Sequence, residues 1–429
     1  MLKHFSKIKK NKTAKNSMIF VVLFTFTNLL NLFFNIYLGK NLRIEDFGVV
    51  ALVVSIFYFA NMIFLALSAT ISHIVSYLSA EKKNEIAINF YKTSRKKFFL
   101  LALLFSIFWI ILTPGLSKFF NIENCLPLIL FTPIFSLGTI ATINKGFLNG
   151  EIKFAKVGFI FFTESASKLL LAILLVAIGI GEWAYIAIPV SVLIAFLVST
   201  IITKKEIKIE KKIEIEKISN NYPVSFPKKF FAAATLSKLS IIAFLGLDFM
   251  LIKHFFNPEE AGYYALLSLV GKIVFFMGDT LNTFTVPLIG KDIGKGKNPQ
   301  ETFLLILFSV SLITILSAIV FGILGKYTAP FIFGEKALVI VPLLPAFAFA
   351  IAGFTISNCI VTYHLAKKQY SFSIVSIFSA ILTALGIVLY HSSLTQVVSV
   401  ISTVSIINLI SIVTLHLLKK DRKRFFVKQ

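Results

Sequence analysis

Charged side chains are rare within the long apolar stretches of this sequence, and those that occur there could do chemistry. Six of them lie away from the ends of these stretches: Glu164, Lys168, Lys238, Asp248, Lys272 and Asp279. Ionisable residues inside a membrane span are costly, and by default they indicate function. A lysine there could hold a phosphate through its fixed positive charge. The three acids could gain and lose a proton, so they are candidates for coupling to an ion.

Each of these residues also has a structural interpretation. Glu164 and Lys168 are four residues apart, so they can pair on one face of a helix. Lys238 and Lys272 have no acid at that spacing. Their ammonium groups could instead extend to the membrane surface or pair with the two aspartates, because charges inside membranes often pair with one another.

Three asparagines form a polar stripe on the first apolar stretch. Asn28, Asn31 and Asn35 follow the spacing of one helical face. An amide side chain both donates and accepts hydrogen bonds, as the recognition of sugar hydroxyls requires. The structural alternative is that these amides bond to neighbouring membrane helices.

Signatures of catalysis are missing from the sequence. We find no nucleotide-binding glycine loop, no spacing typical of zinc ligands and no nucleophile elbow. Cys125 and Cys359 are isolated, so they suggest neither a metal site nor a disulfide framework. The sequence therefore predicts a protein that is not an enzyme and that uses no cofactor or metal.

The elements that must position these residues are membrane-spanning helices. The chain of 429 residues is 57% apolar and only 15% charged, which is unlike a soluble domain. Stretches long enough to span a bilayer occur at about 17–38, 47–79, 98–116, 125–147, 155–178, 183–202, 229–252, 261–289, 302–324, 337–363, 370–390 and 394–418. Because a helix satisfies its own backbone in lipid, we expect an all-α polytopic membrane protein with about twelve transmembrane helices.

The positive charge of the chain predicts its orientation. The net charge of +23 would suit a nucleic-acid partner only if it formed a contiguous basic face; instead it is divided among many short connectors, which argues against such a partner. With the N-terminus inside, the inner segments hold 34 lysines and arginines and the outer connectors 6. The positive-inside rule then places both termini in the cytoplasm of a protein of the plasma (inner) membrane.

One charged connector divides the chain into two halves of six spans. Residues 204–217, KKEIKIEKKIEIEK, have isoleucines that suit neither one helical face nor an uninterrupted strand. We expect an N-terminal six-helix lobe at 1–202, a solvated cytoplasmic linker at 203–228 that contacts anionic membrane lipids, and a C-terminal six-helix lobe with a basic tail at 229–429.

The two halves repeat one another. RIEDFGVVAL at 43–52 aligns with NPEEAGYYAL at 257–266, at an offset of 214, and the same offset pairs Asn144 with Asn358. Repeats of six helices have the same orientation. Parallel repeats with a binding site near the middle of the membrane are a transporter architecture.

Three segments resemble a known family. The segments are NIYLGKNLRIEDFGVVALVVSI at the end of the first span (35–56), NKGFLNGEIKF at 144–154 and LDFMLIKHFFNPEEAGYYALLSLVGKI at 247–273. They are similar to polysaccharide-export flippases of the O-antigen or capsule type. These flippases share a superfamily with multidrug and toxin extrusion transporters and lipid II flippases. The resemblance implies two lobes around a central cavity, alternating access, and a lipid-diphosphate-linked oligosaccharide as cargo, with polysaccharide polymerase machinery as a further partner. It also places Lys238 and Lys272 on helices that line the cavity, where they would bind the diphosphate.

Two other functions compete with a flippase. An ion-coupled drug or cation efflux antiporter of the same superfamily would favour an acidic cavity, whereas the charges near mid-membrane here are lysines with one nearby acid, Glu164. A membrane-embedded polymerase or glycosyltransferase would need a large loop outside the membrane with acidic or arginine catalytic residues. The longest loop, at 203–229, is expected in the cytoplasm and has no such cluster.

Overall fold

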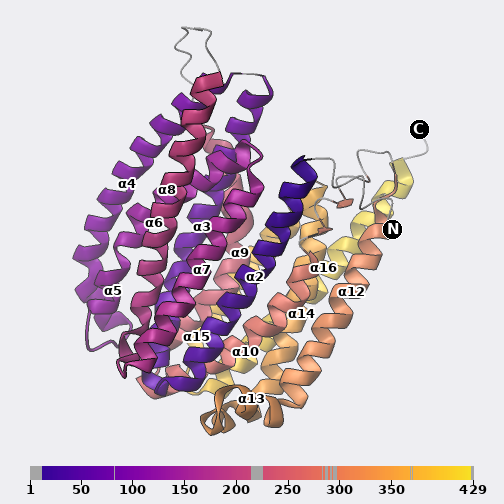
Figure 1. Ribbon diagram of the computed structural model, residues 1–429. Coiled ribbons are helices and arrows are strands. Elements are labelled where there is room, and N and C mark those ends of the chain that lie inside the picture. Colours follow the sequence, from indigo (N-terminus) through magenta and orange to yellow (C-terminus); the bar gives the residue numbers. More distant parts are fainter. Residues whose placement is uncertain are drawn as a thin grey trace. The chain divides into compact units, whose positions relative to one another are not determined.

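Helices make up all the regular structure in the part of the chain that the computed structural model describes (Figure 1). That part comprises residues 12–81, 83–213, 226–282, 284–285, 288–289, 292, 297–367, 369 and 371–426. Eleven helical segments within it are long and apolar enough to cross a membrane. A further helix, α9 (Lys228–Phe255), lies where the seventh span was predicted. The expected all-α polytopic fold of about twelve helices is confirmed.

The chain forms two compact units, residues 1–238 and 239–429, which we call the N-terminal and C-terminal units. The boundary falls within α9. The helices of the N-terminal unit are α2 (Lys12–Asn41), α3 (Ile44–Ala80), α4 (Asn84–Phe119), α5 (Leu126–Phe131), α6 (Pro133–Gly150), α7 (Phe154–Ala177), η1 (Gly181–Ile186), α8 (Ala187–Ile213) and the start of α9.

The C-terminal unit contains the rest of α9 and the elements that follow it. These are α10 (Pro258–Asn282), α12 (Gln300–Ala318), η2 (Ile319–Ile323), α13 (Gly325–Phe333), η3 (Glu335–Leu343), α14 (Leu344–Ala366), α15 (Ser371–Leu389) and α16 (Leu394–Phe426). Within this unit α14 packs on α10, α12 and α16. In the N-terminal unit α6 packs in the same way on α3, α4 and α8, so corresponding helices of the sequence repeat make corresponding contacts.

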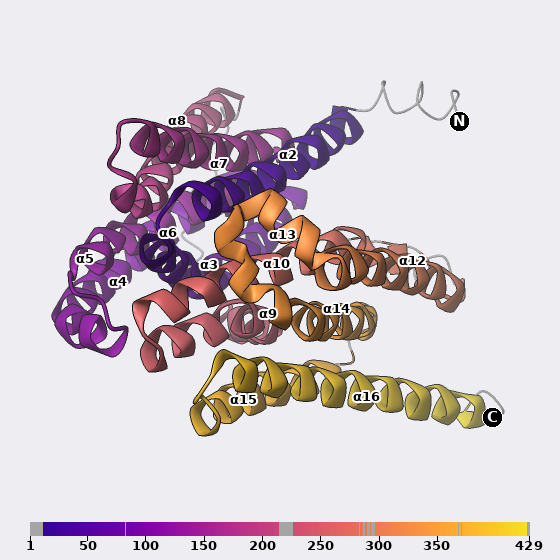
Figure 2. The ribbon, with the colours of Figure 1, turned by 90° about the horizontal axis from the view of Figure 1, so that it is seen from below.

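Glycines allow the closest helix packing in the N-terminal unit. Gly146 and Gly150 are four residues apart on α6, and a Cβ at either would lie within 2.8 Å of an atom of α3. Small residues at this spacing let membrane helices approach closely. Gly158 of α7 does the same for α2, and these two helices run side by side (Figure 2).

Two segments between the predicted spans contain helix. The segment at 80–97 is mostly the first turns of α4, because Ala87, Ile88 and Tyr91 pack in a buried cluster with α3 and α6. The predicted linker at 203–228 is also helical at its start, since α8 continues to Ile213. Residues 214–225 lie outside the described residues.

Contacts that the isoleucine spacing does not reveal stabilise the extension of α8. Ile207 packs on the buried cluster of α3, α4 and α6. The carboxylate of Glu206 is bound by Lys153, at 3.3 Å, and by Lys156. Lys153 lies in the turn between α6 and α7, and Lys156 lies in the first turn of α7. The start of this charged segment is therefore part of the packed N-terminal unit.

The turn between α6 and α7 contains a strained residue. Ile152 has a φ of 58°, a left-handed conformation that is unfavourable for a β-branched side chain. Backbone hydrogen bonds fix the turn: Ile152 donates to Asn149 and Lys153 donates to Leu148, at 3.0 and 2.9 Å. The side chain of Ile152 remains 48% exposed.

Candidate functional site

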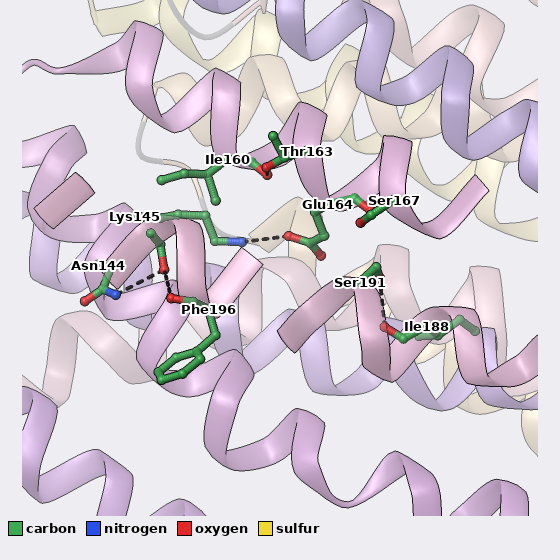
Figure 3. A network of polar contacts seen from close by, with 10 residues as sticks. Asn144, Lys145, Ile160, Thr163, Glu164, Ser167, Ile188, Ser191 and Phe196 are labelled. Atoms are coloured by element: carbon green, nitrogen blue, oxygen red, sulfur yellow. Dashed lines mark hydrogen bonds and ion pairs between the residues drawn. The ribbon is translucent and has the colours of Figure 1, made fainter. Parts of the chain in front are cut away.

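An ion pair joins two helices of the N-terminal unit within their spans. The ammonium group of Lys145, on α6, lies 3.3 Å from the carboxylate of Glu164, on α7. Figure 3 shows the two side chains pointing toward one another. Their side chains are 12% and 17% exposed, so both groups are mostly covered and still accessible. The ammonium of Lys145 also lies 4.3 Å from the centre of the Phe161 ring, which favours a cation.

Lys168 is bound by a neutral partner. Its ammonium group donates a hydrogen bond to the side-chain oxygen of Asn31, on α2. It also lies 4.8 Å from the centre of the buried Phe34 ring. Glu164 is close enough to interact electrostatically with Lys168, but the ion pair of Glu164 is with Lys145. We call Asn31, Lys145, Glu164 and Lys168 the N-terminal charge cluster.

The other asparagines of the predicted stripe have different surroundings. Asn35 donates a hydrogen bond to the backbone carbonyl of Asn31, at 2.8 Å, within the same helix. Asn28 is exposed. Of the three, Asn31 is therefore the one that bonds to a charged residue predicted to be functional, Lys168.

The backbone next to the cluster is fixed by a second polar network. Asn144, beside Lys145, accepts a hydrogen bond from the hydroxyl of Tyr91, at 2.7 Å. Its amide group donates to the hydroxyls of Ser199 and Thr200, both at 3.1 Å. Because Asn144 is fully buried and joins α6 to α4 and α8, it holds the turn of helix from which Lys145 extends.

The cluster extends over several turns of depth. At about 1.5 Å per residue, Lys145 lies about 8 Å from the end of α6 at Gly150. On α7, Glu164 and Lys168 lie about 15 and 21 Å from the neighbouring start of that helix at Phe154. Along the helix axes, Glu164 therefore lies at a depth between those of Lys145 and Lys168.

In the C-terminal unit, a second group of charges is more deeply buried. The hydroxyl of Tyr264, on α10, donates to one oxygen of Asp248, on α9, at 2.8 Å. Lys272 is close enough to interact electrostatically with Asp248. Asp248 is only 6% exposed. This placement of Lys272 corresponds to the structural interpretation in which it pairs with an aspartate.

The second oxygen of Asp248 faces a different environment. It is buried and has no hydrogen-bond partner within the described residues. Asp248 also lines a small cavity of this unit, together with Leu247, Ile351, Ala380, Thr383, Ala384, Ile387 and Ile401. The surroundings of this acid are mostly apolar.

Asp279 belongs to a network of amides. One of its oxygens accepts hydrogen bonds from Asn282, at 2.9 Å, and from Asn358, at 3.1 Å. Asn282 also donates to the hydroxyl of Thr362, so the network joins α10 to α14. Asn358 is the counterpart of Asn144 in the sequence repeat, and both join helices through their side-chain amides.

Two candidate functional residues, Lys145 and Tyr264, were not predicted from the sequence. Lys145 lies only two residues from the end of the span predicted at 125–147, whereas the structure places it five residues from the end of a span candidate, Leu126–Gly150. The signal was its position between two buried stretches of α6. Tyr264 carried no signal beyond being an aromatic residue in an apolar helix. Lys238 lies in α9, but its side chain is outside the described residues.

The described residues contain no group of three or more His, Cys, Asp or Glu side chains that could hold a metal ion. What the N-terminal charge cluster can do is electrostatic. Glu164 pairs with Lys145, whereas Lys168 is bound by the neutral amide of Asn31. The cluster therefore holds two cations and one anion, and a positive charge remains for an anion to neutralise.

Solved structures with the same fold are transporters. An inward-facing multidrug resistance MATE family transporter of the MOP superfamily has a TM-score of 0.71 and 14% identity, over 92% of this chain and 96% of that one. The lipid II flippase MurJ in an inward closed conformation has a TM-score of 0.69 and 16% identity, over 92% and 87%. A MOP superfamily transporter from Pyrococcus furiosus has a TM-score of 0.60 and 15% identity, over 95% of each chain.

At these identities the structures share the fold of this chain. No curated protein is significantly similar to the chain in sequence. The sequence profile of one family, described as polysaccharide biosynthesis protein, matches residues 38–342. Since this match covers most of the sequence, the chain belongs to the family of polysaccharide biosynthesis proteins and has the fold of the MOP-superfamily transporters.

Proposed function

We propose that this protein is a flippase that moves a lipid-diphosphate-linked oligosaccharide repeat unit from the cytoplasmic to the outer leaflet by alternating access. The observation that carries the proposal is the surplus positive charge of the N-terminal charge cluster. It is supported by the family to which the chain belongs. We place the protein in the plasma (inner) membrane with both termini in the cytoplasm, as the distribution of lysine and arginine predicts.

A diphosphate would complete the cluster electrostatically. The amide oxygen of Asn31 and the ring of Phe34 solvate the ammonium of Lys168 without neutralising it. A charge that is not neutralised is costly inside a membrane, so an anion that arrives there is bound strongly. Each ammonium has three N–H donors, which leaves donors on both lysines for phosphate oxygens.

Glu164 is the acid that we propose couples transport to protons. While ionised, it competes with the cargo for Lys145, its partner at 3.3 Å. Protonation would remove this competition and leave both lysines to the diphosphate. Asp248 and Asp279 remain as alternatives that could be tested in the same way.

The second candidate function is an ion-coupled drug or cation efflux antiporter. It is favoured by the similarity to a multidrug transporter, which has a TM-score of 0.71. An organic cation would be repelled by the surplus positive charge of the N-terminal charge cluster, and this favours the flippase.

A reconstitution experiment tests the proposal. Vesicles that contain the full chain would be loaded with a fluorescent lipid-diphosphate-linked oligosaccharide, and its arrival in the opposite leaflet would be followed by quenching. The variant Lys145→Gln/Lys168→Gln should lower the initial rate at least tenfold, because hydrogen bonds to charged groups contribute about 1.5–3 kcal/mol each. Lys118→Gln, which changes an exposed lysine far along the chain from the cluster, is the matched control.

Transport by the double variant at the control rate would contradict the proposed site. Transport of organic cations and not of the lipid by the unaltered protein would favour the antiporter instead.

A further inference from the structure

An open pocket of about 300 Å³ lies between α7 and α8, near the start of α7. Its lining combines charged and apolar side chains: Ala155, Lys156, Phe159, Ile202, Lys205 and Glu206. Nothing in the proposed transport mechanism uses these residues, and none of them belongs to the N-terminal charge cluster.

The floor of the pocket is a neutralised carboxylate. The side chain of Glu206 is 6% exposed, and its two oxygens are bound by different lysines, Lys153 and Lys156. Lys205 is exposed beside it. Two ammonium groups thus bind one carboxylate and a third lysine lines the same pocket, so the pocket remains positive. Lys156 uses one of its three N–H donors for Glu206, so it can donate to a further anion from a fixed position.

The charged and apolar residues are arranged in layers. Along α7, Phe159 lies three residues closer to the middle of the span than Lys156, about 5 Å deeper. Along α8, Ile202 lies three residues closer to the middle than Lys205, again about 5 Å. Phe159 is 47% exposed. The pocket therefore presents cations at the end of the spans and apolar surface beneath them.

We propose that this pocket binds the headgroup of an anionic phospholipid. Lys156 and Lys205 would donate to the phosphate, and the beginning of an acyl chain would lie against Phe159 and Ile202. Basic pockets between membrane helices bind lipid headgroups in this manner. A soluble phosphate would have the same two lysines but would gain nothing from the apolar wall, so the layering favours a lipid.

Lipid retention tests the site. The full chain would be incorporated into nanodiscs of phosphatidylcholine with one fifth phosphatidylglycerol, extracted in a mild detergent and examined by native mass spectrometry. The unaltered protein should retain one phosphatidylglycerol in preference to phosphatidylcholine. Lys205→Gln should lower its apparent affinity about fivefold, which corresponds to about 1 kcal/mol for one lysine near an anionic lipid.

Lys204→Gln is the matched control, because Lys204 is the exposed neighbour of Lys205 and does not line the pocket. Lys156→Gln should have a larger effect, but it also removes a partner of Glu206, so Lys205→Gln is the cleaner variant. Lys205 does not contact Glu206 in any ion pair of the described residues, and its variant should fold.

Three outcomes would overturn the proposal. Equal losses in Lys204→Gln and Lys205→Gln would show diffuse attraction to the membrane surface instead of a site. Retention of phosphatidylcholine equal to that of phosphatidylglycerol would show that the pocket does not recognise the negative charge of the headgroup. Displacement of the lipid by millimolar inorganic phosphate would identify a site for free phosphate.

Discussion

The charged groups of the two units differ in balance and in burial. In the N-terminal unit, two lysines face one acid, and the ion pair of Lys145 and Glu164 is 12% and 17% exposed. In the C-terminal unit, Asp248 is 6% exposed and interacts with Lys272 and the hydroxyl of Tyr264. The first group has a net positive charge that can bind an anion. In the second group, the charge of Lys272 is balanced by the carboxylate of Asp248, which also accepts a hydrogen bond from Tyr264.

The difference teaches that sequence repeats need not repeat function. The buried asparagine of each half, Asn144 or Asn358, keeps its structural role in both units. The charged residues are not at matching positions. We therefore expect the N-terminal charge cluster to tolerate neutral substitutions structurally and to lose transport, and the C-terminal group to lose stability first.

The largest expected effect follows from removing the cation of the C-terminal group. Lys272→Gln should remove an ammonium that stabilises the buried carboxylate of Asp248, at a cost in stability of at most about 3–5 kcal/mol, the cost of breaking a buried ion pair. Thermal unfolding of the purified protein in detergent would measure the loss. The double variant Lys272→Gln/Asp248→Asn should recover most of it. A Lys272→Gln protein that is stable but inactive would instead indicate that Lys272 binds cargo.

Neutralising one acid in each unit compares their roles in coupling. Glu164→Gln should abolish the dependence of lipid transport on a pH gradient and lower the driven rate to the rate measured without a gradient, because the amide cannot gain or lose a proton. Asp248→Asn should keep that dependence while altering stability. The readout is quenching of the fluorescent lipid in vesicles with and without an imposed gradient. Gradient dependence that survives in Glu164→Gln and disappears in Asp248→Asn would reverse the assignment.

Helix packing offers a smaller contrast between the units. A Cβ at Gly278, on α10, would lie 2.0 Å from the hydroxyl oxygen of Thr314, whereas one at Gly158, on α7, would lie 3.2 Å from Leu23. Gly278→Ala should destabilise the protein by about 1–3 kcal/mol through overpacking. Gly158→Ala should cost less, because a shift of a few tenths of an ångström suffices. Equal melting temperatures for the two variants would contradict the packing described for α10.

Cysteine labelling tests whether the two halves have the same orientation in the membrane, and it should leave activity unchanged. Glu182 and Ser393 lie in corresponding connectors, each before the sixth helix of its half. Single cysteines there should both react with an impermeant thiol reagent from outside, whereas one at Glu81 should not. The background would be Cys125→Ser/Cys359→Ala, since Cys125 is partly exposed. Labelling of Glu182 and Ser393 from opposite sides would refute parallel halves.

The sequence predicted the helical fold well because hydropathy is a local property. Span length and the scarcity of charge follow directly from the bilayer, and α7 and α15 begin and end within one residue of their predicted ranges. The extension of α8 was missed because its stability comes from other helices. Ile207 packs on a cluster of distant residues, and Glu206 is bound by lysines fifty residues away in the chain.

The partners of the charged residues could be predicted only in part, for the same reason. Spacing showed that Glu164 and Lys168 can meet within one helix, but the ion pair of Glu164 is with Lys145 on another. Asn31 was identified by residue type, and its bond to Lys168 depends on how closely α2 approaches α7. Such contacts are set by packing, which one sequence does not reveal.

The left-handed conformation of Ile152 has a consequence for how the bilayer supports the protein. An isoleucine in this conformation costs about 1–2 kcal/mol, and half of its side chain is exposed at the end of two spans. An apolar side chain at that depth can insert among the lipid headgroups and recover a similar free energy. The lipid would then offset the strain of the turn, and the turn that holds Lys153 should be best ordered in a membrane and loosen when detergent replaces it.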